Sequence, residues 1–252
     1  MSDIPQKEYS TAVGSAPESD LCAQLARRLP GFDPAALSPT DAVADRIALG
    51  PPPADLTGFP SRLLRAGSTV YRSHSIAHDA WCFASAPNTG GGRFDLPPPF
   101  GTCYVAATMQ AALRERLRAT IPSSGNVPPQ LAQTFAVSSF AVPRDYRCAD
   151  IDSARAVRFG VTRELATMTP SHYPLARLWA VGFAEAGFDG IRYGARFTTG
   201  RPNAWALFGP AGAHQQPEPA VKHRTPGPDA CHRCGLSTCP IADLMSLSVS
   251  DH

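Results

Sequence analysis

Three side chains able to act on a nucleotide lie at regular intervals in the first half of the chain: Arg93, Tyr104 and Glu115, with eleven residues from each to the next. Arg93 follows three glycines ending at Gly92, and glycine allows backbone conformations that give a ligand close access. The planar arginine fork binds two phosphate oxygens at once. A tyrosine ring packs on a flat base, and a carboxylate stabilises a developing cation. Together these residues predict cleavage of an N-glycosidic bond in a nucleotide such as NAD.

Each residue also has an ordinary structural explanation. Glu115 lies between Arg114 and Arg116, as a solvated surface glutamate would. Arg93 fits a surface loop, and a tyrosine in a strand is more often a core residue with a bonded hydroxyl. The three glycines form neither a dinucleotide fingerprint nor a P-loop. The joint order and spacing therefore carry the prediction, not any single residue.

Short strands and helices are expected to position these groups. The pattern predicts strands at 68–72, 102–106, 133–142, 190–193 and 204–208, and helices at 108–119, 154–168 and 174–186. The alternation in 133–142 changes phase at Ser138 and Ser139, which indicates a bulge. Because strands and helices do not alternate regularly, an α+β fold with a split, mainly antiparallel sheet flanked by helices fits better than a doubly wound sheet.

Composition divides the chain into three parts. Residues 1–60 are expected to form a flexible N-terminal segment with two short helices, and the proline run at 51–53 breaks the chain before the main domain. Residues 61–212 form the predicted main domain. Residues 213–252 are polar and proline-rich and contain three cysteines, which indicates a flexible tail.

Charge and cysteine content limit the class of protein. The net charge of +2 gives no reason to expect direct nucleic-acid binding or an anionic membrane as partner. No apolar run reaches the roughly 20 residues of a membrane span, and the first residues lack a signal sequence. Seven cysteines, an odd number, favour a reduced, cytoplasmic protein.

Several short motifs, taken in order, resemble the RES domain, the toxin half of bacterial Xre–RES toxin–antitoxin modules. The motifs are Val70-Tyr71-Arg72, Gly91-Gly92-Arg93-Phe94, Tyr104-Val105-Ala106 followed by Glu115, Trp179, Asp189-Gly190-Ile191 and Ala206-Leu207-Phe208. The resemblance implies a fold related to ADP-ribosyltransferase toxins. It also implies an enzyme that consumes NAD by hydrolysis, by phosphorolysis or by transfer of ADP-ribose to a protein.

The resemblance also assigns roles to particular residues. Arg72 and Glu115 match the arginine and glutamate after which the family is named, so the resemblance makes both of them catalytic residues, with Glu115 as the catalytic carboxylate. Arg72 and Arg93, with Gly92, would hold the diphosphate or ribose region, and Tyr104 would pack on the nicotinamide. Ala195 stands where the family has its serine. Thr198 or Thr199 could supply the missing hydroxyl.

Three cysteines near the C-terminus form a second candidate site. Cys231, Cys234 and Cys239 could bind a structural zinc ion with His232 or His223 as the fourth ligand. A redox-labile disulfide, or a tail without any site, explains the spacing equally well. The cluster is not part of the RES pattern.

Two functions from different classes follow. The first is an NAD-cleaving enzyme without a catalytic metal, acting as a toxin with an Xre-type antitoxin as partner. The second is a non-catalytic protein that binds a nucleotide or a partner on the same fold, which Ala195 favours. The sequence leaves open which acceptor receives the ADP-ribosyl group. It also leaves open the oligomeric state, and a homo-oligomer is possible.

Overall fold

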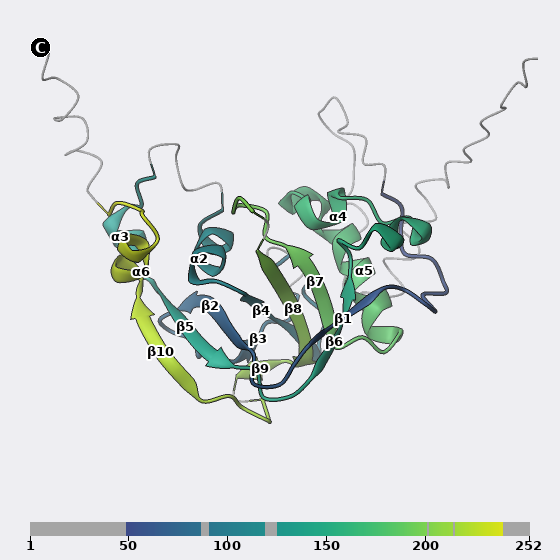
Figure 1. Ribbon diagram of the computed structural model, residues 1–252, viewed down its shortest axis with the longest axis horizontal. Helices are drawn as coiled ribbons and strands as arrows, with labels where there is room; N and C mark the ends of the chain where they lie inside the picture. Colours follow the sequence, from purple (N-terminus) through teal and green to yellow (C-terminus); the bar gives the residue numbers. More distant parts are fainter. Residues whose placement is uncertain (1–48, 87–90, 119–124, 201, 214, 239–252) are drawn as a thin grey trace, which may run out of the picture.

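The computed structural model describes residues 49–86, 91–118, 125–200, 202–213 and 215–238 (Figure 1). The short helices expected within residues 1–48 lie outside this part of the chain. The described residues form ten strands: β1 (Ser61–Leu64), β2 (Thr69–Ser75), β3 (Cys82–Phe83), β4 (Phe100–Ala106), β5 (Phe135–Ala141), β6 (Tyr146–Asp150), β7 (Gly190–Gly194), β8 (Asn203–Pro210), β9 (Gly212–Ala213) and β10 (Val221–Pro226). The helices are α2 (Met109–Leu117), α3 (Pro129–Ala132), α4 (Glu164–Thr167), α5 (Tyr173–Glu185) and α6 (Gly227–Arg233), with 3-10 turns at Ala154–Phe159 and Pro170–His172. Among the described residues, no helix is long and apolar enough to cross a membrane.

Eight of the strands form one sheet in the order β1-β6-β7-β8-β4-β2-β5-β10. Every neighbouring pair in it is antiparallel except β6 and β7, which the crossover containing α5 connects. β3 and β9 form a separate two-stranded sheet. The predicted α+β fold with a mainly antiparallel sheet flanked by helices is confirmed.

The large sheet is divided in its middle. β4 pairs with β8 along its whole length, and β2 pairs with β5 along its whole length. Between β4 and β2, in contrast, only Tyr71 and Ala106 are paired. The two halves of the sheet therefore diverge from a single point of contact.

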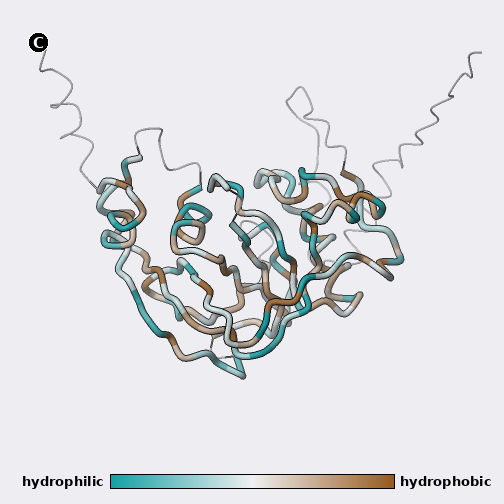
Figure 2. The backbone as a smooth tube through the Cα atoms, in the orientation of Figure 1, coloured by the Kyte–Doolittle hydropathy of each residue, from teal (hydrophilic) through white to brown (hydrophobic). Residues whose placement is uncertain are grey.

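Apolar side chains cover both faces of the sheet. In β8, Ala206 and Phe208 belong to the larger core under α2 and α5, whereas Trp205 and Leu207 belong to a smaller core on the opposite face. This alternation follows from the two-residue period of a strand. In Figure 2, brown stretches mark hydrophobic residues along strands of the large sheet.

Several local predictions differ from the structure. The helix expected at 154–168 is instead the 3-10 turn Ala154–Phe159, which Gly160 ends at a φ of 82°, followed by the short α4. The bulge expected at Ser138 is wrong for β5, whose pairing with β2 is continuous. Both serines of β5 are buried because neighbouring strands and cores enclose them, and the register shift lies in β10 instead.

Both ends of the described chain pack on the domain. The indole Nε1 of Trp179 donates to the Gly50 carbonyl at 3.0 Å, and Leu56 and Phe59 are buried in the larger core. At the other end, β10 pairs with β5, and Cys231 of α6 is fully buried. The expectation of a flexible tail is wrong up to residue 238. β10 is the edge strand of the sheet, and most of its residues are exposed to solvent, so most of them are hydrophilic.

Candidate active site

A cavity of about 550 Å³ lies over the division in the sheet, a size typical of sites for small molecules. Its walls come from both halves: Tyr71 and Ser73 of β2, and Tyr104 and Ala106 of β4. The C-terminal half of α2 and the loop at 91–95 complete it. The diverging strands thus create the space, and the side chains that face it come from distant parts of the sequence.

The glycine loop adopts one conformation because Asp95 holds it. The Asp95 carboxylate accepts from the Gly92 amide at 2.6 Å and from the Tyr104 hydroxyl at 2.7 Å. The same hydroxyl accepts from the Phe94 amide at 2.8 Å. A Cβ atom on Gly92 would lie only 2.4 Å from the Tyr104 oxygen. Only glycine fits at this position, and it is the close approach, not a positive φ, that requires it.

Asp95 was not identified from the sequence. Its side chain is 2% exposed, and burial raises its pKa above the ordinary value, although the bonds from Gly92 and Tyr104 oppose this change. Burial likewise raises the pKa of Tyr104 well above its usual range, so that the hydroxyl stays protonated and can donate. The one available signal was an aspartate three residues after a glycine, a spacing typical of side chains that close local turns.

Arg93 lines the cavity, and it is a buried residue, 7% exposed. Its guanidinium lies 5.4 Å from the ring centroid of Phe94 and 5.6 Å from that of Tyr193. One Nη donates to the Ala166 carbonyl. The Nε atom has no hydrogen-bond partner among the described residues. The side chain is therefore held in place, and its Nε donor is unused.

Glu115 also lines the cavity. Thr108, whose hydroxyl caps α2 by accepting from the Ala111 amide at 3.1 Å, sets the start of the helix that carries it. The Glu115 Oε1 atom accepts from the backbone amides of Arg196 at 2.6 Å and Phe197 at 3.1 Å. One carboxylate oxygen therefore orders the loop between β7 and β8, and no hydrogen bond to the other is found among the described residues.

Arg72 is not among the residues that line this cavity. It lies between Tyr71 and Ser73 on β2, which face the cavity, so its own side chain points to the opposite face of the sheet. There it donates to the Ala80 carbonyl at 3.1 Å and to Cys103 Sγ at 2.7 Å. The structure thus brings together Gly92, Arg93, Tyr104 and Glu115, and it separates Arg72 from them.

Most of the chain matches the model of a known protein family. The RES domain family model matches residues 62–226, more than half of the chain. This chain belongs to the RES domain family. The matched region runs from β1 to the last residue of β10, so the RES domain contains all eight strands of the large sheet.

A solved structure is also similar to the chain, that of the M. tuberculosis MbcT–MbcA toxin–antitoxin complex. The sequence identity is 15% and the TM-score 0.48, covering 65% of this chain and 85% of that chain. No curated protein matches the sequence.

The RES position that holds alanine in this chain lies beside the cavity, not in its wall. Ala195 is 3% exposed and belongs to the larger core. It lines a second hollow of about 500 Å³ formed with the loop at 194–200. The Oγ1 atom of Thr198, in the same hollow, is buried without a partner among the described residues. Thr198 thus offers an uncommitted hydroxyl close to Ala195 in the sequence.

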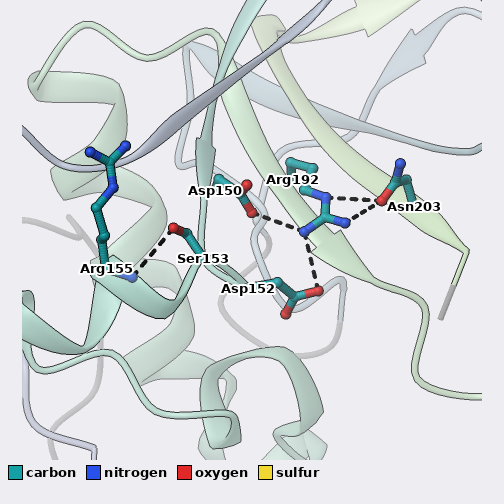
Figure 3. Close-up of polar contacts among 6 residues, drawn as sticks. All are labelled: Asp150, Asp152, Ser153, Arg155, Arg192 and Asn203. Atoms are coloured by element: carbon teal, nitrogen blue, oxygen red, sulfur yellow. Dashed lines mark hydrogen bonds and ion pairs between the residues drawn. The ribbon is translucent and has the colours of Figure 1, made fainter.

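An ionic network holds the strands that lead into this loop (Figure 3). Arg192 of β7 donates to Asp150 at 2.9 Å and to Asn203 of β8 at 3.0 Å, and it pairs with Asp152 at 3.5 Å. These bonds tie the end of β7 to β6 and β8. These contacts hold β7 in place, and β7 leads into the loop that Glu115 binds.

The predicted zinc site in the cysteine cluster is not supported. The described part of the chain contains no group of three side chains able to hold a metal ion. Burial raises the pKa of the Cys231 thiol to about 11 and also raises that of Cys234. His232 is exposed at the end of α6. Cys239 lies outside the described residues.

Proposed function

We propose that this RES domain consumes NAD by breaking the bond between nicotinamide and ribose in the cavity over the divided sheet. The observation that carries the proposal is that Arg93, Tyr104 and Glu115, evenly spaced in the sequence, line one cavity of a RES-family chain. Their chemistry matches the parts of the dinucleotide: an arginine for phosphate or ribose, an aromatic ring for nicotinamide and a carboxylate for the ribose hydroxyls.

In this mechanism Glu115 acts on the ribose. The carboxylate oxygen not engaged by the loop accepts hydrogen bonds from the ribose hydroxyls, and its charge stabilises the oxocarbenium-like transition state. The bond between ribose C1′ and the nicotinamide nitrogen breaks, and its electron pair leaves with neutral nicotinamide. Water, phosphate or a protein nucleophile then forms the new bond to C1′ and gives up its proton.

Tyr104 and Gly92 prepare the site for this step. The Tyr104 hydroxyl is occupied by Asp95 and Phe94, so we assign recognition to its ring rather than to its oxygen. The absence of a side chain at Gly92 lets the loop backbone lie against the tyrosine. Arg93 lines the same cavity, and its Nε donor has no partner among the described residues.

The test is incubation of the purified protein with NAD, with and without phosphate, followed by chromatography of the products. Free nicotinamide with ADP-ribose indicates hydrolysis, and a phosphate-dependent product indicates phosphorolysis. Label transferred from NAD to protein indicates ADP-ribosyl transfer. Glu115→Gln should abolish each of these products without unfolding the protein, and unchanged NAD in the wild-type reaction would contradict the proposal.

A non-catalytic function is the second candidate, and one observation favours it: the buried methyl group of Ala195 replaces the family serine. In that case NAD binds but is not cleaved.

Membership in the family further suggests a toxin role in the cytoplasm with a protein antitoxin. Expression of the chain should then arrest bacterial growth, and expression of Glu115→Gln should not.

A further inference from the structure

Two more arginines lie at the wall of the same cavity, and neither belongs to the motifs that identified the family. Arg116 and Arg118 follow Glu115 at the C-terminal end of α2, and both line the cavity. No hydrogen bond or ion pair of either guanidinium is found among the described residues. These are two cations at the edge of a site proposed to take an anionic substrate.

Aromatic rings hold the two guanidinium groups against opposite halves of the sheet. Arg116 lies 5.3 Å from the ring centroid of Phe135, which begins β5 in the half containing β2. Arg118 lies 5.9 Å from the ring centroid of Tyr173, which begins α5, the helix packed on β7 in the other half. Stacking on a ring fixes the face of a guanidinium and leaves its N–H edge available to an anion.

The backbone of Arg118 is strained. Its φ of 49° and ψ of −133° make it the one non-glycine residue with positive φ in the described part of the chain. Such conformations cost about 1–3 kcal/mol in general and cluster at binding sites. Arg118 is the C-cap of α2, and its backbone amide donates to the Arg114 carbonyl. Helices commonly end at a residue with positive φ, but this residue is usually glycine, which adopts the conformation without strain.

The charges of the cavity leave a cationic excess near these residues. Both oxygens of Asp95 are engaged, by Gly92 and Tyr104, and the side chain is buried. Among the described residues of the wall, Glu115 is the other carboxylate, against the three cations Arg93, Arg116 and Arg118. The charge of Arg118 also reaches into the site, since it opposes the burial that raises the pKa of Asp95.

We propose that Arg116 and Arg118 form a clamp for the diphosphate of a dinucleotide, with one guanidinium held against each half of the divided sheet. The inference rests on the proposed function and specifies which residues hold the anionic part of its substrate. It transfers to Arg116 and Arg118 the role that the resemblance gave to Arg72. The strain at Arg118 is then the structural cost of directing its side chain to the ligand.

The experiment compares ligands with and without the diphosphate. Calorimetry measures the binding of NAD, ADP-ribose and nicotinamide riboside to the wild-type protein and to Arg116→Ala, Arg118→Ala and Arg114→Ala. Arg114 comes from the same helix but is absent from the cavity wall, so it serves as the matched control. Each clamp variant should bind NAD and ADP-ribose about tenfold to a hundredfold more weakly, as expected for a lost charged hydrogen bond. Binding of nicotinamide riboside should not change.

The outcomes separate this inference from the proposed function. If the wild type cleaves NAD and both clamp variants bind ADP-ribose as tightly as Arg114→Ala does, the clamp is wrong and the function stands. If the clamp variants lose ADP-ribose while the wild type leaves NAD intact, the clamp stands and catalysis is wrong. An equal loss of nicotinamide riboside would overturn the clamp in favour of general damage to the site.

Arg118→Gly adds a readout that a purely structural arginine would not give. Glycine adopts this backbone conformation without strain. The variant should therefore melt at a higher temperature than the wild type while binding ADP-ribose at least tenfold more weakly. A lower melting temperature together with unchanged binding would overturn the assignment.

Discussion

The Glu115 carboxylate and the Arg196 backbone amide are joined by a hydrogen bond of 2.6 Å. The residue proposed to stabilise the ribosyl cation therefore also fixes the loop between β7 and β8. A substitution at Glu115 changes two properties at once, and the choice of replacement decides whether they can be separated.

Glu115→Gln should separate them. Glutamine keeps an oxygen that accepts from the loop amides but removes the charge, so the fold is retained and transition-state stabilisation is lost. Turnover should fall at least a hundredfold, about 3 kcal/mol of activation free energy, with the melting temperature within a few degrees of wild type. Glu115→Ala, which lacks the acceptor, should lower both turnover and the melting temperature. Equal turnover in wild type and Glu115→Gln would remove Glu115 from the mechanism.

Gly92→Ala should disrupt the loop that carries Arg93. The added methyl group would overlap the Tyr104 hydroxyl and the Asp95 carboxylate, so the hydrogen bonds among them cannot all persist. We expect a loss of about 1–3 kcal/mol in the free energy of unfolding and a large loss of NAD affinity. Gly50→Ala is the control, because nothing lies within 4 Å of its added Cβ. Denaturant unfolding of both variants checks the prediction, and equal stability would contradict the packing described.

Asp95 should make stability depend on pH. Burial raises its pKa in the folded protein. Its contribution is therefore fully present below the unfolded value of about 3.9 and is lost as the pH rises through the folded pKa. Asp95→Asn cannot ionise. The free energy of unfolding of wild type minus that of Asp95→Asn should decline as the pH rises above about 4. Urea unfolding at a series of pH values tests this, and a difference independent of pH would refute it.

Arg72→Met should act on stability rather than on ligand binding. The substitution removes the donor shared by the Ala80 carbonyl and Cys103 Sγ, on the face of β2 away from the cavity. We expect about 1–3 kcal/mol less stability and an NAD affinity close to wild type in the folded fraction. A loss of affinity as large as that of the clamp variants would return Arg72 to the site.

Thr198→Val tests whether its buried hydroxyl replaces the family serine. Valine has nearly the same shape, and the hydroxyl has no partner in the described structure, so the variant should be at least as stable as wild type. If Thr198 contacts the substrate or orders the loop around it, turnover should fall about tenfold or more. Ala195→Ser in the Thr198→Val background should then restore part of the rate. No change in either variant would exclude both hydroxyls.

Order and spacing along the sequence single out Arg93, Tyr104 and Glu115, and all three line one cavity in the structure. It could not assign Arg72 to a face of the sheet. Alternation along β2 puts Tyr71 and Ser73 on one face and Arg72 on the other, but which face carries the cavity depends on where β4 and α2 pack. Asp95 could not be recognised either, because its role depends on burial and on Tyr104, whose position is set by a different strand.

The prediction of a flexible tail is wrong up to residue 238 for a related reason. Lys222, His223 and Arg224 read as the composition of a solvated tail. They belong to β10, which needs few apolar side chains because one of its edges is free. Hydrophobic patterning identifies elements that are buried on a face, and it gives little signal for a strand held mainly by main-chain hydrogen bonds.

The position of β10 beside β5 bears on how the protein behaves at high concentration. Six of the seven residues of β5 are buried. A chain truncated before Val221 would expose the main-chain donors and acceptors of this apolar strand, a template for pairing with other molecules. The intact protein instead presents Lys222, His223 and Arg224 at that edge, all exposed. Their charge and hydration oppose the addition of a strand from another molecule. β10, the last strand of the RES domain, therefore also reduces aggregation of the protein.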